Sequence, residues 1–232
     1  MNYIQKIKRL YDLSENKNYG FSENQILTLE KKLDIELPIK FKEYYLELGI
    51  EENLNYSFNR LLKPENEIGF SDDSFLVFYE EHQNVAFWGI KKEDLLQGNP
   101  PIYGNYDTVE KLHWEIETSS IENFFLLMAV FNGTLGGLPY NGNYFGEVDP
   151  EIVNFIAANY TLISEISKEN QKVYTDQFYD VIILSFDKDT NCSGAFIGTS
   201  NQERFDSILE QLDIDWSYLS YDDEEDHNEE QL

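Results

Sequence analysis

The chain contains 232 residues, 41% of them hydrophobic, which suits one large domain or one domain with an appended half. Its longest apolar run, Phe124 to Phe131, has eight residues, whereas a membrane-spanning helix needs about 20. The N-terminus has no apolar signal core, and the single cysteine excludes an internal disulfide or a multi-cysteine zinc site. We therefore expect a cytoplasmic protein without a membrane span.

The charge is strongly negative, because 17 Lys and Arg residues stand against 44 Asp and Glu residues, for a net charge of −27. Residues 1–48 hold eight basic and eight acidic side chains, so the whole excess lies in residues 49–232, with nine basic and 36 acidic. Binding of nucleic acid or of an anionic membrane is not expected, because phosphate groups are bound by Lys and Arg. Two explanations of the acidity stay open, namely a basic protein partner and solubility alone.

Three amphipathic helices are predicted near the start of the chain. Ser22 is the expected N-cap of the second helix, over about 22–33, and Gln25 completes a capping box. Pro38 is the expected first residue of the third helix, which stops near Gly49. The apolar positions of the three helices recur at helical spacing and are expected in the core: Ile4, Ile7 and Leu10; Ile26, Leu29 and Leu33; Phe41, Tyr44, Tyr45 and Leu48.

A β-hairpin and a helix are predicted in the middle of the chain. Residues 75–79 and 85–90 are rich in aromatic and β-branched side chains, and the polar segment 80–84 between them is short enough for a hairpin connection. Ser119 and Ser120 precede a helix that contains the longest apolar run, and the Gly-rich residues 132–137 end it.

A helix, two strands and a second helix are predicted in the last hundred residues. Asp149 is the expected N-cap of the first helix, and Pro150 is its first residue. Residues 180–186 are expected to form a buried strand, with residues 194–198 as its neighbour. Ser200 is expected to open the last helix, whose inward side chains are Phe205, Ile208, Leu209 and Leu212.

An ordered series of these residues resembles the SUKH superfamily, the family of fungal cell-wall-synthesis regulators and of many bacterial immunity proteins. The series covers about residues 20–130: residues 21–26, Leu29, Glu30, Leu33, Leu37, Pro38, Phe41, Tyr44, Tyr45, Leu48, Gly49, residues 75–79 and 83–90, Asn99 to Pro101, Trp114, Ile121, Phe124, Phe125 and Leu126. Segment 49–72 departs from the family pattern, since it lacks the Gly-rich loop often seen after the helix that stops near Gly49. The resemblance implies an α+β fold with an antiparallel sheet flanked by helices, and a non-enzymatic binding role.

The chain is expected to have three parts, of which only the first is based on this resemblance. Residues 1–132 are expected to form the SUKH-like domain, and residues 133–220 are expected to be a C-terminal α/β extension packed on the same domain. Residues 222–230 hold seven acidic side chains in nine, so residues 221–232 are predicted to be a disordered acidic tail.

Acidic pairs flank the predicted hairpin, and strand ends with their loops cluster in space. These pairs could therefore form one negative patch that steers a basic partner, although solvated loops are the plainer explanation. Trp88 follows Phe87 in a strand, so the two side chains lie on opposite faces, and Trp88 is either a binding residue on the exposed face or a core residue. The candidate protein-binding residues are Asp72, Asp73, Glu80, Glu81, Trp88, Glu93 and Asp94.

No catalytic, metal-binding or cofactor-binding residue is assigned. The three histidines, His82, His113 and His227, lack the i, i+4 spacing of a zinc site, and Cys192 lies in a polar, acidic segment that disfavours the thiolate. The resemblance and the charge favour an immunity-type protein that binds a basic toxin domain, such as a nuclease, and covers its active site. The main alternative is a non-enzymatic regulatory or scaffold protein with several cellular partners, and an enzyme of unknown type comes third.

Overall fold

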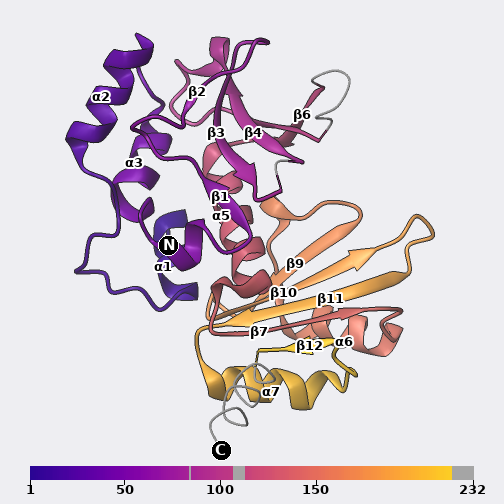
Figure 1. Cartoon of the computed structure of the whole chain (residues 1–232). Helices are drawn as coiled ribbons and strands as arrows, with labels where there is room; N and C mark the ends of the chain where they lie inside the picture. Colours follow the sequence, from indigo (N-terminus) through magenta and orange to yellow (C-terminus); the bar gives the residue numbers. More distant parts are fainter. Residues whose placement is uncertain (84, 107–112, 221–232) are drawn as a thin grey trace, which may run out of the picture. The chain divides into compact units, whose positions relative to one another are not determined.

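The computed structural model describes residues 1–83, 85–106 and 113–220 (Figure 1). Over these residues the chain has an α+β fold with two antiparallel sheets, as expected. The predicted acidic tail, 221–232, lies outside the described residues. None of the helices in the described ranges has the length and apolarity to cross a bilayer.

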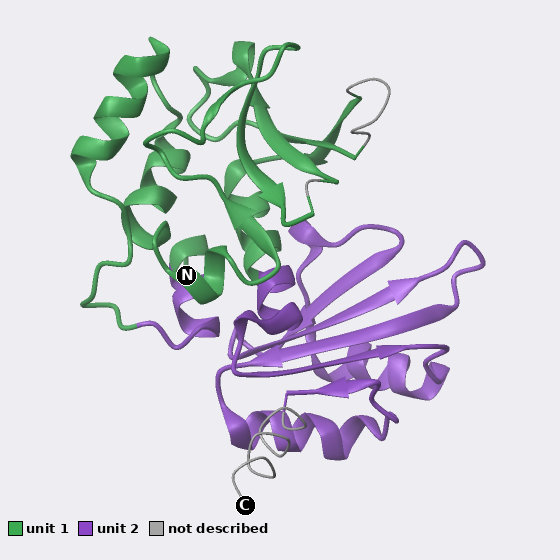
Figure 2. Cartoon of the chain, viewed as in Figure 1, with its two compact units in different colours: residues 1–4, 14–129 green, residues 5–13, 130–232 purple. Residues whose placement is uncertain are grey.

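The chain divides into two compact units (Figure 2). The first unit comprises Met1–Ile4 and Ser14–Ala129, and the second unit comprises Gln5–Leu13 and Val130–Leu232. The division after Ala129 lies three residues before the boundary expected from the sequence at 132, and residues 5–13 count with the second unit although they come early in the chain.

The sheet of the first unit is an antiparallel meander in the order β1-β3-β4-β5-β6, with β2 also paired to β3. Its strands are β1 (Asn59–Leu61), β2 (Gly69–Phe70), β3 (Phe75–Glu81), β4 (Phe87–Lys91), β5 (Ile102–Asn105) and β6 (Trp114–Thr118). Pairing of β3 with β4 confirms the predicted hairpin. The sequence did not predict β1, β2, β5 or β6, which are short.

Four helices of this part of the chain begin and end close to the predicted positions: α1 (Tyr3–Leu10), α2 (Glu23–Leu33), α3 (Ile39–Leu48) and α5 (Ile121–Asn132). Two short helices, α4 (Glu52–Asn55) and the 3-10 helix η1 (Lys92–Asp94), were not predicted. The capping box at α2 is confirmed, since the Gln25 N–H donates to Ser22 Oγ at 3.4 Å and the Ser22 N–H donates to Gln25 Oε1 at 2.8 Å. Pro38 is the N-cap of α3 rather than its first residue, and Gly49 is its C-cap.

Aromatic side chains form the core of the first unit, as the helical spacing predicted. Tyr44 of α3 stacks on Phe125 of α5 with ring centroids 3.6 Å apart, and Phe78 of β3 meets Phe125 edge-on at 5.9 Å. The buried Tyr44 hydroxyl donates to Asn55 Oδ1 at 2.7 Å, and Asn55 Nδ2 donates to the Leu48 carbonyl at 2.7 Å. These two bonds satisfy polar groups that would otherwise be buried without partners.

The second unit contains another antiparallel sheet, in the order β12-β7-β11-β10-β9-β8. Its strands are β7 (Tyr140–Phe145), β8 (Thr161–Leu162), β9 (Gln171–Thr175), β10 (Asp180–Phe186), β11 (Cys192–Thr199) and β12 (Tyr218–Leu219). The predicted neighbours β10 and β11 are confirmed, with Ile182 opposite Ile197. The strands β7, β8, β9 and β12 were not predicted.

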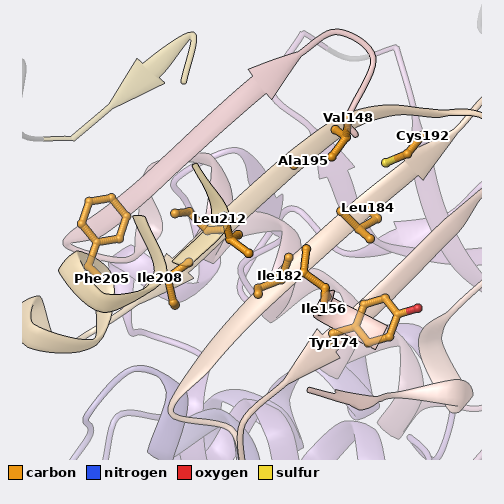
Figure 3. Packing of buried hydrophobic residues seen from close by; sticks show 11 residues of the cluster. Val148, Ile156, Tyr174, Ile182, Leu184, Cys192, Ala195, Phe205, Ile208 and Leu212 are labelled. Atoms are coloured by element: carbon orange, nitrogen blue, oxygen red, sulfur yellow. The ribbon is translucent and has the colours of Figure 1, made fainter. Parts of the chain in front are cut away.

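Two helices, α6 (Pro150–Asn159) and α7 (Gln202–Leu212), pack their apolar sides on β10 and β11 (Figure 3). Two shorter helical segments, η2 (Gly133–Gly137) and η3 (Ser164–Ile166), complete the unit. Asp149 caps α6 as predicted. The N-cap of α7 is Asn201, not Ser200, because Asn201 Oδ1 accepts from the Arg204 N–H at 3.0 Å. Cys192 is buried at the start of β11 and not in a polar loop.

Candidate protein-binding surface

The β3–β4 hairpin separates the predicted acidic pairs into two groups. Its register sets Phe75 opposite Lys91 at one end and Glu80 opposite Phe87 at the other. The Lys92 N–H donates to the Ser74 carbonyl at 3.0 Å, which brings the segments on either side of the first end together. Five residues of strand span roughly 16 Å, so the expected single patch is wrong.

We call the group at the first end the acidic end; it consists of Asp72, Asp73, Glu93 and Asp94. Asp72 and Asp73 are exposed in the turn before β3. Asp94 Oδ1 accepts from Gln97 Nε2 at 2.7 Å, and the Glu93 carboxylate pairs with the Lys91 ammonium. Asp72 and Asp73 are thus exposed carboxylates of the acidic end that form no ion pair with another described residue.

The other pair, Glu80 and Glu81, has local partners. Arg60 lies opposite Glu80 across β1 and β3, and its Nε donates to Glu80 Oε1 at 3.0 Å while its Nη1 donates to Glu67 Oε1 at 2.9 Å. Glu81 Oε2 accepts from the Gln83 N–H at 2.7 Å. Glu80 thus holds two strands together, and its charge is compensated within the first unit.

Burial works against the ionised form of Glu67, but the Lys63 N–H and the Arg60 guanidinium outweigh it and hold the pKa of this carboxyl below its usual range. The pair formed by Arg60 and Glu67 is therefore ionised at neutral pH. Glu80 belongs to this same charge network, in which the Arg60 guanidinium offsets one of two carboxylate charges and joins β1 to β3 at the edge of the sheet.

An aromatic face adjoins the acidic end; we define it as Phe75, Tyr103, Trp114 and Ile116. The Phe75 ring stacks on Trp114 with centroids 4.3 Å apart and meets Tyr103 edge-on at 5.3 Å. Ile116 lies opposite Tyr103 in the register and is 65% exposed. The Tyr103 hydroxyl donates to Asp94 Oδ2 at 3.4 Å, which connects the two surfaces.

Gly89 allows these rings to meet across three strands. It lies on β4 between Val77 of β3 and Tyr103 of β5. A Cβ at this position would lie 2.9 Å from the Leu76 carbonyl oxygen and 3.4 Å from the Phe75 Cβ. Because Gly89 has no side chain, the rings of Phe75, Tyr103 and Trp114 can contact one another above β4.

Trp88 is a core residue. The prediction that it is a binding residue on the exposed face is therefore wrong, and the alternative, a core residue, is correct. Only 5% of Trp88 is exposed. Its ring meets Tyr79 edge-on at 6.0 Å and lies 6.1 Å from the Phe124 ring of α5, on the helix-covered side of the sheet. Phe87, half-buried, takes the opposite side.

Sequence reasoning missed the binding potential of Tyr103, Trp114 and Ile116. A signal was present in β6, where Trp-Glu-Ile-Glu-Thr alternates between apolar and acidic residues as a half-exposed strand does. Trp114 entered only as part of the family pattern. Its Nε1 is buried without a hydrogen-bond partner among the described residues.

A polar cavity of about 480 Å³ in the second unit is a further feature that could take a ligand. Arg204 Nη1 donates to Asp176 Oδ2 at 2.9 Å and to Asp180 Oδ2 at 2.8 Å. Burial raises the pKa of Asp180, in spite of the Asp176 N–H and the Arg204 guanidinium. Three charged residues of this cavity, Arg204, Asp176 and Asp180, are thus paired with one another.

Within residues 1–83, 85–106 and 113–220, no group of three or more His, Cys, Asp and Glu residues is placed to hold a metal ion. No protein-family model, no curated protein and no solved structure matches this chain.

Proposed function

We propose that this chain is a non-enzymatic binding protein that captures a basic protein partner through the acidic end and the aromatic face. Its specific role is that of a cytoplasmic immunity-type protein, which neutralises a basic toxin domain such as a nuclease by covering its active site. The observation that best supports this proposal is that the exposed carboxylates of Asp72 and Asp73 adjoin the aromatic face, which includes the exposed Ile116.

Charge and apolar area would act at different stages of binding. A net charge of −27 attracts a basic partner over a distance and raises the association rate. Aromatic and aliphatic side chains lengthen the life of the complex once water has been expelled from them. A nuclease fits as a partner, because a surface that binds phosphates carries the opposite charge.

The resemblance to the SUKH superfamily supports the same role. It covers about residues 20–130 and includes the β3–β4 hairpin and Trp114. Members of that family bind other proteins without transforming them. The proposal therefore needs no substrate cleft in either unit.

The test uses the protein encoded by the neighbouring reading frame, purified with its own activity disabled. Stopped-flow fluorescence should show association that slows at least tenfold between about 50 and 500 mM NaCl. The double variant Asp72→Asn, Asp73→Asn should lower the association rate about three- to tenfold at low salt and leave the dissociation rate nearly unchanged.

A matched control removes two charges elsewhere. Glu151→Gln with Glu210→Gln takes two exposed carboxylates from helices of the second unit and should change the association rate less than twofold. Equal effects of the two double variants would refute the acidic end as the steering surface. Absence of a complex at low salt would refute the function itself, and similar affinity for several unrelated basic proteins would favour the regulatory scaffold.

A further inference from the structure

We propose that the partner completes the sheet of the first unit by adding a basic strand to the edge of β6 that no other described strand covers. This inference rests on the proposed function, because it names how a basic partner engages the aromatic face. The structural basis is a five-residue edge strand with an exposed apolar side chain between two carboxylates.

β6 lies at the margin of the sheet and pairs with β5 alone among the described strands (Figure 1). In an antiparallel sheet, alternate residues of an edge strand turn their N–H and C=O groups away from the neighbouring strand. Those groups can bind a further strand. The other marginal strands of the two sheets, β1, β2, β8 and β12, have only two or three residues, so β6 offers the longest edge in the part of the chain that the structure describes.

The side chains of β6 specify what kind of strand would fit. Ile116 belongs to the aromatic face and is 65% exposed. The Glu115 side chain, on the other face, is 73% exposed. Glu117 follows at the bulge between β5 and β6, where its Oε2 accepts from the Tyr106 hydroxyl. A strand with alternating basic and apolar residues would set its cations against Glu115 and Glu117 and an apolar side chain against Ile116.

A second copy of this chain fits the same edge poorly. Antiparallel pairing of two β6 strands about Ile116 would place Glu115 of each copy opposite Glu117 of the other. Like charges directly opposite one another destabilise a sheet. The edge therefore resists self-association and remains open to a strand of opposite charge, which is how acidic edge residues can select a partner.

The test uses two synthetic peptides of equal charge and composition. One alternates lysine and valine over eight residues, and the other carries the four lysines and the four valines in two separate blocks. Titration at about 50 mM NaCl should show at least tenfold tighter binding of the alternating peptide. In amide hydrogen exchange, saturation with it should slow every second amide of Trp114–Thr118 at least tenfold and leave the amides of β8 unchanged.

A pair of variants locates the site. Ile116→Lys should weaken binding of the alternating peptide at least tenfold, because it removes the apolar contact and adds repulsion. Leu162→Lys makes the same charge change at an exposed apolar residue of β8, an edge strand of the second unit, and should weaken binding less than twofold.

The outcomes separate this inference from the proposed function. If both peptides bind equally and the β6 amides are not protected, strand addition is refuted, while electrostatic capture of a basic partner stands. If the chain captures the partner with the expected salt dependence but its β6 amides exchange as in the free protein, strand addition is again refuted. Binding of neither peptide at low salt would overturn both.

Discussion

Replacement of Arg204 by methionine should destabilise the second unit by about 3 kcal/mol at neutral pH. Arg204 provides the cation for Asp180, whose side chain is only 2% exposed. After the substitution the Asp180 carboxylate keeps the Asp176 N–H, at 2.8 Å from Oδ1, but loses its counter-ion. Methionine retains most of the aliphatic stem, so the change mainly removes charge.

The magnitude follows from the exposure of the two partners. Breaking a fully buried ion pair costs roughly 3–5 kcal/mol, because an unpaired charge stays buried. The Arg204 side chain is 34% exposed, so water can enter in its place and the loss should lie near the lower limit. The second pair, with the partly exposed Asp176, adds less than about 1 kcal/mol.

The loss should depend on pH. Burial raises the pKa of Asp180 in the folded protein, so ionisation of this group already opposes folding as the pH rises through that pKa. Removal of Arg204 raises the pKa of Asp180 further. Near pH 4, close to the pKa of an unfolded aspartate, the carboxyl is protonated in the folded variant, and most of the destabilisation should disappear.

Urea unfolding at pH 7 and pH 4, with hydrogen exchange of the β10 amides as the local reporter, measures these effects. Arg9→Met is the matched control: Arg9 is exposed and lies over the Tyr179 ring at 4.9 Å, as Arg204 does at 4.8 Å. It should cost less than about 1 kcal/mol. Adding Asp180→Asn to Arg204→Met should recover most of the stability that Arg204→Met loses, because the double variant has no unpaired buried carboxylate. Equal stabilities of the single and double variants, or an equal loss at both pH values, would contradict the reasoning.

Three further predictions concern single residues. Gly20→Ala should destabilise the first unit by at least ~2 kcal/mol in urea unfolding, since its Cβ would lie 1.9 Å from the Leu46 carbonyl oxygen, whereas Gly69→Ala, with nothing within 4 Å, should be nearly neutral. Ser22→Ala should cost about 1 kcal/mol by the same measurement, because it removes a capping box. Burial raises the pKa of the Cys192 thiol, so its alkylation at pH 8 should be at least tenfold slower in the folded chain than in urea; equal rates would show that the thiol is accessible.

Local signals in the sequence were reliable where neighbouring residues decide the structure. The Ser22–Gln25 capping box and the Asp149 N-cap depend on bonds that close within three residues, and both are present. Residues 180–186, with the apolar run 181–184 at their centre, form a strand whose side chains are buried on both faces of a sheet over most of its length. Predictions of this kind need no knowledge of the remaining chain.

Strand β7 shows why other elements escaped prediction. Its sequence, Tyr-Asn-Gly-Asn-Tyr-Phe, contains residues that usually mark turns. It is a strand because β11 pairs with one of its sides and β12 with the other, and both partners come much later in the chain. Residues 5–13 present a similar case: the Ser200 hydroxyl donates to the Leu10 carbonyl at 2.5 Å, a contact between segments 190 positions apart.

The features of the candidate surface also divide into those that the sequence predicted and those that depend on tertiary structure. From the amino acids alone came the acidity confined to residues 49–232, the hairpin and the carboxylates around it, since composition and short-range periodicity carry that information. The expectation of an α+β class came from the family resemblance. Only the folded chain decided which carboxylates share one end, that Trp88 faces the helices, and that Tyr103, Trp114 and Ile116 join Phe75. The reason is strand register. A shift of one residue in the pairing of two strands moves every side chain to the opposite face of the sheet, and long-range contacts fix the register.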